Sequence, residues 1–244
     1  MLRGFRKAVG SALRYQFKDA IWQIKYYFGY YNVGWYRDLF SQAKSSEIAG
    51  EITPAYSILD YEDVARIRRI NPGMKHIFLI RNPIDRAWSA IRYHTKVGKL
   101  SVDLSSDEEV IAVLKERGTI LRGDYERTLE TYLEYFDSKQ ILVCFYDAIQ
   151  SDPVKLMSNV TTFLGVADFE EADLDNQKRV LSSPQSPIPG SVRSYLLEAY
   201  GLTIDRLSRT FGSYARVWQS EVGSSGRYPC NQLSSDELFP TFHP

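Results

Sequence analysis

The stretch Lys75–His94 (KHIFLIRNPIDRAWSAIRYH) decides the fold class of this chain. It opens with a dense apolar run over residues 75–80, whose length and composition are typical of a buried parallel strand. Asn82 and Pro83 follow at once. Because Asn is a good N-cap and Pro is favoured in the first helical turn, the sequence predicts a helix over residues 84–96.

Patterns on either side extend this unit into alternating strands and helices. A second buried strand is predicted at Gln140–Tyr146, and Glu47–Ile52 alternates in the manner of a short strand. Spacing and end signals predict further helices at Asp60–Ile70, Asp107–Arg117, Asp124–Phe136, from Asp152-Pro153 to Gly165, and at Ser191–Phe211. The order predicts an α/β fold with a small, mostly parallel sheet flanked by helices.

The composition is that of an ordinary folded protein. The 244 residues are 44% hydrophobic and 25% charged, which excludes a disordered tail, a fibre and a long coiled coil. We expect one domain over residues 1–219, followed by a Ser-, Gly- and Pro-rich tail or covering segment over residues 220–244.

The net charge is zero, but it is unevenly distributed. Residues 1–100 hold 17 Lys and Arg against 8 Asp and Glu, and residues 101–244 hold 13 against 22. A neutral protein with a basic first half is no general nucleic-acid binder, so no nucleic-acid partner is expected. The basic half could hold a compact polyanion in a local site, or the two halves could simply neutralise each other.

Two further features bear on the cellular setting. No apolar run approaches the roughly 20 residues that a membrane span needs, and residues 1–16 lack the apolar core of a secretory signal. Cys144 and Cys230 are too few for a disulfide framework, and no cysteine or histidine cluster has zinc spacing. We therefore expect a reduced, cytoplasmic setting and no metal. A Golgi lumen would require the chain to be a fragment of a longer membrane-anchored protein.

The end of the first buried strand is the candidate ligand site. Ligands of open α/β sheets bind outside the carboxyl ends of the strands, and a helix N-terminus there offers free N–H groups to an anion. Arg81 supplies a planar fork suited to phosphate, and Ser89 lies one turn beyond Asp85 on the same helix face. The alternative is that Arg81 is a surface ion-pair partner and Ser89 a packed small residue.

This stretch resembles the motif of sulfotransferases that use 3′-phosphoadenosine-5′-phosphosulfate (PAPS). The residues Arg81 to Ser89 look like the family segment that binds the 3′-phosphate of the nucleotide, and Gly50–Tyr56 (GEITPAY) is similar to the family's Gly-Glu-x-[Ser/Thr]-Pro-x-Tyr segment. The likeness covers roughly residues 34–218. It implies a P-loop-nucleotide-kinase-like sulfotransferase fold, with PAPS as sulfuryl donor and Arg81 and Ser89 as nucleotide-binding residues.

The resemblance implies further contacts to the donor. A second phosphate contact is expected after the FLGV helix, where Lys178 and Arg179 stand; their alternative is a solvated helix end. Family members also carry an N-terminal Lys-x-Gly-Thr-Thr loop around the 5′-phosphosulfate. The nearest match here is Lys7, Gly10 and Ser11, which departs from that pattern by one extra residue, by Ala12 and by the lack of a preceding strand. An ordinary basic helix start is the alternative.

The resemblance leaves the catalytic base open. The family uses a Glu of a Lys-Glu pair or a His; Lys18-Asp19 is the Lys–acid pair in the corresponding region, and His94 ends the motif helix. The candidate catalytic residues are therefore Lys7, Asp19 and His94. Glu51 is a third candidate base, with a structural role as its alternative.

The resemblance implies sulfuryl transfer from PAPS to a hydroxyl or amine. The acceptor could be a small molecule or a glycan, and the oligomeric state is not predicted. The alternative function is a non-enzymatic remnant that binds 3′-phosphoadenosine 5′-phosphate (PAP) but has lost the phosphosulfate loop. A group of aromatic side chains could stack on a sugar ring or an aromatic acceptor, or could be core and interface residues: Tyr26, Tyr27, Tyr30, Tyr31, Trp35 and Tyr36.

Overall fold

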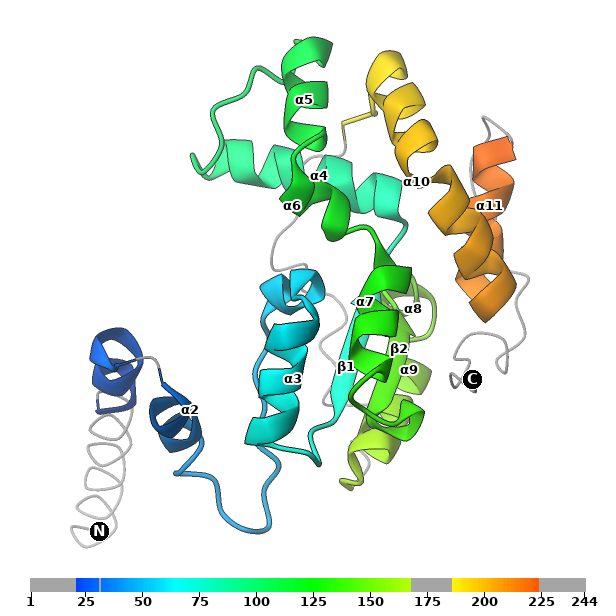
Figure 1. Cartoon of the computed structure of the whole chain (residues 1–244). Coiled ribbons are helices and arrows are strands. Elements are labelled where there is room, and N and C mark those ends of the chain that lie inside the picture. Colours follow the sequence, from blue (N-terminus) through cyan, green and yellow to red (C-terminus); the bar gives the residue numbers. More distant parts are fainter. Residues whose placement is uncertain (1–20, 31, 168–185, 224–244) are drawn as a thin grey trace, which may run out of the picture. The chain divides into compact units, whose positions relative to one another are not determined.

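The computed structural model describes residues 21–30, 32–167 and 186–223, and the chain divides into two compact units, residues 1–52 and 53–244 (Figure 1). In the first unit residues 21–28 are helical, and helix α2 spans Val33–Leu39. The short strand predicted at residues 47–52 does not form. The backbone there finds no partner strand among the described residues, and the Glu47 carboxylate instead caps the preceding turn by accepting from Lys44 N at 3.0 Å.

The second unit holds the predicted alternation of helices and strands. Its elements are η1 (Pro54–Ile58), α3 (Tyr61–Ile70), β1 (His76–Ile80), α4 (Pro83–Lys96), α5 (Asp107–Leu114), α6 (Arg117–Leu121), α7 (Tyr125–Leu133), η2 (Ser138–Gln140), β2 (Ile141–Phe145), α8 (Ala148–Ser151), α9 (Pro153–Leu164), α10 (Gly190–Phe211) and α11 (Ser213–Gly223). This order confirms the predicted α/β fold with a small parallel sheet.

The two strands β1 and β2 pair in parallel, with His76 opposite Ile141 and Ile80 opposite Phe145. Parallel neighbours need a long crossover, and helices α4 to α7 supply it. Figure 1 shows α4 lying beyond the carboxyl end of β1. Both strands therefore end at the same edge of the sheet, where the chain turns into α4 and α8.

Aromatic side chains cover one face of this sheet. Phe78 of β1 packs edge-on against Tyr132 of α7, with ring centroids 5.0 Å apart. Phe145 of β2 contacts Tyr214 and Trp218 of α11, with centroids 5.5 and 5.4 Å away. On the opposite face β2 is buried along its length, whereas β1 leaves Ile77 and Leu79 41% and 50% exposed.

Most predicted helices form within about three residues of their expected ends, and two regions differ. The helix predicted over residues 107–117 ends at Leu114, because the backbone at Glu116 is extended and restarts as α6. Helix α11 was not predicted. It follows a sharp turn at Gly212 and Ser213, both with positive φ, and buries Trp218. The expected domain end at residue 219 therefore falls inside a helix, and the two-part division of the chain at residue 219 stays a prediction.

The η1 segment, which holds the Pro-Ala-Tyr part of the sequence motif, is tied to α7. The Arg127 guanidinium donates to the carbonyl oxygens of Ser57 and Leu59 at 2.6 and 2.9 Å. The Thr128 hydroxyl donates to Ser57 O at 2.8 Å, and the Tyr132 hydroxyl donates to Tyr56 O at 3.2 Å. The motif residues at this point therefore serve to fasten a loop to the core.

Candidate functional site

The candidate site lies where the two strands end. Arg81 follows β1 directly, Tyr146 follows β2, and the Tyr146 backbone N–H donates to Ile80 O at 2.7 Å, which extends the pairing by one residue. The Arg81 guanidinium lies over the Tyr146 ring, with Cζ 4.9 Å from the ring centroid. This cation–π contact holds the cation at the carboxyl edge of the sheet.

The backbone of Arg81 is clamped by a buried tyrosine. The Tyr125 hydroxyl donates to Arg81 O at 2.9 Å and accepts from Arg81 N at 3.4 Å. Burial raises the pKa of Tyr125, so the hydroxyl stays protonated and can donate. Gly123, just before this helix, leaves room for the Tyr200 ring, since a Cβ there would lie 2.5 Å from it. The sequence placed Tyr125 in the helix predicted at Asp124–Phe136, and the structure adds its contact with the Arg81 backbone.

The N-terminus of α4 has fewer free backbone N–H groups for an anion than we expected from its sequence. Pro83 has no N–H, and the Ile84 N–H donates to the Asn82 side chain at 3.0 Å. The acidic Asp85 stands in the same first turn. The first turn therefore has fewer free backbone donors than the sequence suggested, because Pro83 lacks one and the Asn82 cap occupies another. Side-chain cations must supply most of the attraction for an anion here.

Three arginines act electrostatically on Asp85 of α4. Burial raises the pKa of Asp85, and the nearby positive charges of Arg81, Arg193 and Arg92 partly oppose this effect. Arg92 lies seven residues after Asp85 on α4 and so shares its helix face, while Arg193 comes from the first turns of α10. The charges of three guanidinium groups, from the β1–α4 junction, from α4 and from α10, therefore act on one half-buried carboxyl group.

Asp147, the residue after Tyr146, carries the second carboxyl group at this edge of the sheet. One oxygen of Asp147 accepts from the Trp218 indole at 3.3 Å, and the other is buried without a hydrogen-bond partner among the described residues. Burial raises the pKa of Asp147, the Trp218 hydrogen bond and the Arg81 charge lower it, and the Asp85 charge raises it further. Asp85 and Asp147 thus both lie within electrostatic reach of Arg81.

The structure describes Arg81, Ser89, His94 and the candidate base Glu51, whose carboxylate accepts a hydrogen bond from the Tyr36 hydroxyl at 2.6 Å. Arg81 is central to the cluster, and Ser89 is half-buried on the same face of α4 as Asp85 and Arg92. His94 is exposed in the last turn of α4. Nine residues of helix place it about 13 Å from Asp85 along the axis and on the opposite side, which does not favour a role beside Arg81. Outside the described residues lie the remaining predictions: Lys7, Gly10, Ser11, Asp19, Lys178 and Arg179.

Sequence reasoning missed Arg193 and Asp147. A signal existed for each. A basic residue in the first turns of a helix interacts unfavourably with the helix dipole. Arg193 near the start of α10 therefore indicated an acidic partner outside its own helix. Asp147 stands two residues after a buried strand, at the same edge as Arg81, where a carboxyl group has no reason to lie in a purely structural sheet.

The described arrangement suits a multiply charged anion. Guanidinium groups bind phosphate through two parallel hydrogen bonds, and partial burial strengthens that attraction. The two carboxyl groups limit the net positive charge of the free site. The other residues expected to hold an anionic group are outside the described part of the chain.

No helix in the described residues is both long and apolar enough to traverse a bilayer.

Curated proteins that are similar in sequence to this chain include sulfotransferases. Human heparan sulfate glucosamine 3-O-sulfotransferase 3B1 is 29% identical over 141 residues, a match that covers 55% of this chain and 35% of that protein. Human bifunctional heparan sulfate N-deacetylase/N-sulfotransferase 2 is 24% identical over 147 residues, covering 56% of this chain and 17% of that protein. The chain thus spans about a third, or less, of the length of these relatives.

A solved structure shares the fold. The crystal structure of a sulfotransferase from Alicyclobacillus acidocaldarius superposes with a TM-score of 0.61 at 21% identity, covering 81% of this chain and 78% of that one. The model of the sulfotransferase domain family matches residues 62–183, which is half of the chain and includes the whole strand–Arg81–helix unit. The chain therefore belongs to the sulfotransferase family.

Proposed function

We propose that the chain transfers a sulfuryl group from PAPS to a hydroxyl or amine of a glycan acceptor. The observation that carries the proposal is the Arg81 guanidinium held over the Tyr146 ring at the carboxyl edge of the sheet, where the charges of Arg92 and Arg193 also act on the half-buried Asp85. PAPS supplies the sulfuryl group when bound. The named relatives act on heparan sulfate by their names, and this is the support for a glycan as acceptor.

The described residues have binding and orienting parts in this function. Arg81 would hold the 3′-phosphate of the donor, with its guanidinium oriented by the Tyr146 ring and its backbone by the Tyr125 hydroxyl. Ser89 would donate a hydrogen bond to the same phosphate. Because the 3′-phosphate does not change during the reaction, these contacts stabilise bound donor and transition state alike.

The residues that act on the reacting group are proposed from the sequence. Lys7, Gly10 and Ser11 would hold the 5′-phosphosulfate, Lys178 and Arg179 would add a second phosphate contact, and Asp19 would accept the acceptor's proton. His94 is kept as the weaker candidate base, since α4 places it away from Asp85. These roles follow from the family resemblance and from no described contact.

The test combines binding with transfer. Titration calorimetry of the full chain with PAP, using adenosine as the control ligand, measures donor binding, and we expect PAP to bind at least 100-fold more tightly because the phosphates provide most of the affinity. Transfer of labelled sulfuryl from PAPS is then measured on heparan sulfate, on uncharged glycans, and on phenols and lipids as control acceptors. Equal responses to PAP and adenosine would contradict the proposed site.

Kinetics separate the two halves of the donor site. Lys7→Ala should lower kcat, since Lys7 would act on charge that grows only in the transition state, whereas Arg81→Ala should raise KM for PAPS. An unchanged kcat for Lys7→Ala would show that the N-terminal loop assignment is wrong. Tight PAP binding with no transfer to any acceptor would favour the non-enzymatic remnant over the enzyme.

For the compartment we keep the cytoplasmic prediction. Cys144 lies in β2, is 1% exposed, and burial raises the pKa of its thiol to about 12. A thiol this buried and protonated reacts slowly with oxidants, so it places no demand on the redox state of the compartment. Fractionation of the full-length protein tests the location directly.

A further inference from the structure

Arg193, near the start of α10, is a cation at the candidate site that no described carboxylate holds in an ion pair. Its side chain is partly buried. Within the described part of the chain, its guanidinium makes no ion pair and donates no hydrogen bond. A guanidinium group in this state can still bind an anionic ligand with its full set of N–H donors.

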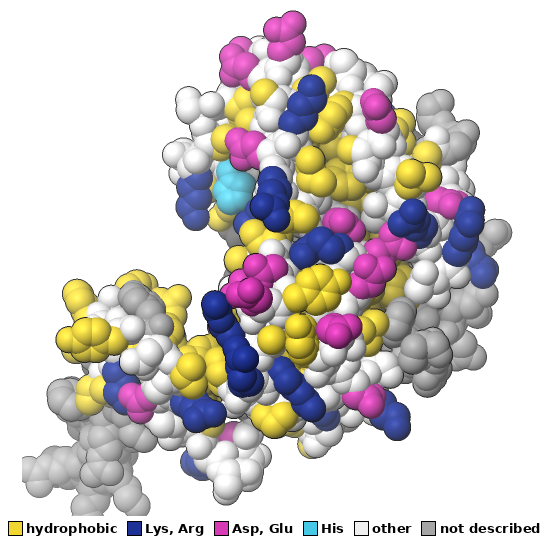
Figure 2. All heavy atoms as spheres, viewed as in Figure 1, with side chains coloured by type: hydrophobic (Ala, Val, Ile, Leu, Met, Phe, Trp, Pro, Cys, Tyr) yellow, Lys and Arg dark blue, Asp and Glu magenta, His cyan; other side chains and the backbone are white. Residues whose placement is uncertain are grey.

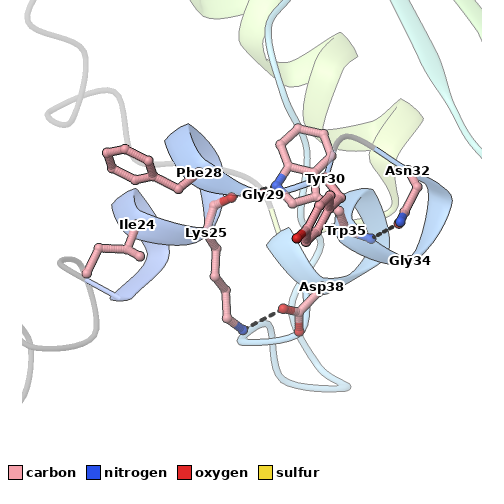
Figure 3. Close-up of a pocket in the computed structure, with 9 residues that line it drawn as sticks. All are labelled: Ile24, Lys25, Phe28, Gly29, Tyr30, Asn32, Gly34, Trp35 and Asp38. Carbon is pink, nitrogen blue, oxygen red and sulfur yellow. Dashed lines mark hydrogen bonds and ion pairs between the residues drawn. The ribbon is translucent and has the colours of Figure 1, made fainter.

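Other cations of the chain differ from Arg193 because carboxylates hold them. In the open pocket of the first unit, Lys25 Nζ lies 2.6 Å from Asp38 Oδ2, and Figure 3 shows these two side chains meeting. Near the end of α10, Arg209 lies 2.7 Å from Asp205. Figure 2 shows other Lys and Arg side chains next to Asp and Glu side chains on the visible surface of the second unit. Cations paired in this way have less to offer a ligand.

Two hydrogen bonds fix the start of α10 against its neighbours. The Trp88 indole of α4 donates to Ser186 O at 3.0 Å, in the segment that leads into α10. The Ser191 hydroxyl donates to the Asp107 carboxylate at the start of α5. The fold therefore sets the position of the Arg193 backbone before any ligand binds, which lowers the entropic cost of binding.

Arg193 lies close to the same carboxyl group as Arg81. Val192, the residue before it, is 0% exposed, so Arg193 stands at the margin of the buried face of α10. The charges of Arg81 and Arg193 both lower the pKa of Asp85, although burial still keeps this pKa raised. Two guanidinium groups thus approach one position, from the end of β1 and from the start of α10.

Folding stability alone does not favour a cation at residue 193. A positive charge near a helix start interacts unfavourably with the helix dipole, and the first turn of α10 carries no acidic residue to offset it. Neither Arg81 nor Arg193 forms an ion pair with Asp85 among the described residues. The two guanidinium groups therefore keep hydrogen-bonding capacity for an anion that lies between them.

We propose that Arg193 binds the 3′-phosphate of the donor nucleotide together with Arg81. This deepens the proposed sulfuryl transfer and rests on it. A phosphate monoester has three oxygens that can accept charge-assisted hydrogen bonds from two guanidinium groups on different sides. The pair would make the site selective for nucleotides that carry a phosphate at the 3′ position.

Titration calorimetry of the full chain with PAP and with adenosine 5′-monophosphate (AMP) tests this assignment. AMP lacks the 3′-phosphate, so the ratio of the two affinities reports the contacts made to that group. We expect the wild type to prefer PAP by about 100-fold, and Arg193→Gln to lower this preference about tenfold with AMP binding nearly unchanged. Arg209→Gln, on the same helix, is the matched control and should keep the full preference.

A second background separates contact from charge balance. If Arg193 only neutralised Asp85, Arg193→Gln would not affect PAP binding in the Asp85→Asn background. Contact with the phosphate predicts the same loss of about tenfold in both backgrounds. Arg193→Lys keeps the charge but not the planar fork, and it should lose about threefold of the preference. Urea unfolding of each variant verifies that it folds.

The outcomes distinguish this inference from the proposed function. Should Arg81→Ala remove the preference for PAP while Arg193→Gln retains it, the role of Arg193 is overturned and the proposed function stands. A loss that disappears in the Asp85→Asn background would make Arg193 a structural counter-charge and would also overturn the inference. A wild-type chain that binds PAP and AMP equally would overturn both the inference and the proposed donor site.

Discussion

The two ends of the β1–β2 sheet are built for different purposes. At the amino end, two polar side chains are bonded to the main chain: the Gln140 amide donates to Pro72 O and Met74 O at 2.9 and 3.0 Å, and Lys75 Nζ donates to Phe163 O at 2.5 Å. At the carboxyl end, burial raises the pKa of both Asp85 and Asp147, and the charge of Arg81 opposes this rise in each.

The difference teaches how to separate structural from functional polarity in this fold. Main-chain carbonyls that fill the hydrogen-bonding capacity of a side chain leave it nothing to offer a ligand. Buried groups whose charges are only partly balanced can still be stabilised by a charged ligand. Burial lowers the pKa of His76 at the amino end and raises the pKa of Asp85 and Asp147 at the carboxyl end. The two ends should therefore respond differently to a change in pH.

The largest effect is expected for removal of the Arg81 guanidinium. Arg81→Ala should weaken PAP binding by about 3 kcal/mol, or more than 100-fold, since two charge-assisted hydrogen bonds are lost. Lys75→Ala removes a cation at the other end of the same strand and should leave PAP binding within about twofold. Calorimetry measures both. If the two variants lose similar affinity, the ends do not differ in function.

A smaller loss of binding is expected on α4. Ser89→Ala should cost about 2 kcal/mol of PAP binding by removing one hydrogen bond to a charged group, with the unfolding free energy nearly unchanged. Ser101→Ala, at an exposed position in the loop after α4, is the control. An affinity equal to that of the wild type would mean that Ser89 serves packing.

At the amino end the pH dependence of stability should be dominated by His76. Burial between the Tyr132 and Phe136 rings lowers the pKa of His76 to about 4. Since its pKa is near 6.5 when unfolded, the unfolded state binds the proton first, and stability falls as the pH drops from about 7 towards 4. Allowing for partial exposure, the loss between pH 7 and pH 5 is about 1.5 kcal/mol.

His76→Phe removes this titrating group while keeping a ring between Tyr132 and Phe136. Urea unfolding at pH 7 and pH 5 should show that the variant loses about 1.5 kcal/mol less than the wild type over this range. A variant whose acid sensitivity matches that of the wild type would place the responsible group elsewhere.

The smallest effect, of opposite sign, belongs to Asp147. Burial raises the pKa of Asp147, so the folded state binds a proton more readily than the unfolded state. The free-energy cost of the buried charge is therefore present at neutral pH. It is relieved as the pH falls through the pKa of the folded state. Asp147→Asn keeps an oxygen for the Trp218 indole. It should raise the unfolding free energy at pH 7 by about 1 kcal/mol. A variant less stable at pH 7 than the wild type would show that the ionised form is needed.

Much of the fold was predictable because its signals are local. The apolar run before Arg81 and the Asn-Pro helix start gave β1 and α4 to within a residue. The break at Glu116 and the start of α11 were missed, because tertiary packing of Leu114 and Trp218 decides them. The strand expected at residues 47–52 failed for the related reason that alternation cannot supply a partner strand.

The candidate site was predictable only in its linear part. Arg81 and Ser89 lie in one motif, so their sequence pattern identified them. Arg193 and Asp147 reach the site from α10 and from the end of β2, far along the chain, and only the folded topology brings them to Arg81. The helix-dipole contribution was overestimated because the same Asn82 that marks the helix start also uses its first free N–H.

The parallel pairing of β1 and β2 has a kinetic consequence. His76 lies opposite Ile141, so the first hydrogen bond between the strands closes a loop of 65 residues. Closing a loop of this length costs roughly 4 kcal/mol of chain entropy before any sheet contact repays it. The strands should therefore join late, after α4 to α7 have formed and shortened the effective path between them. A nucleotide bound at Arg81 and Tyr146 would contact the ends of both strands. It would stabilise the paired sheet, and the native chain would unfold more slowly in its presence.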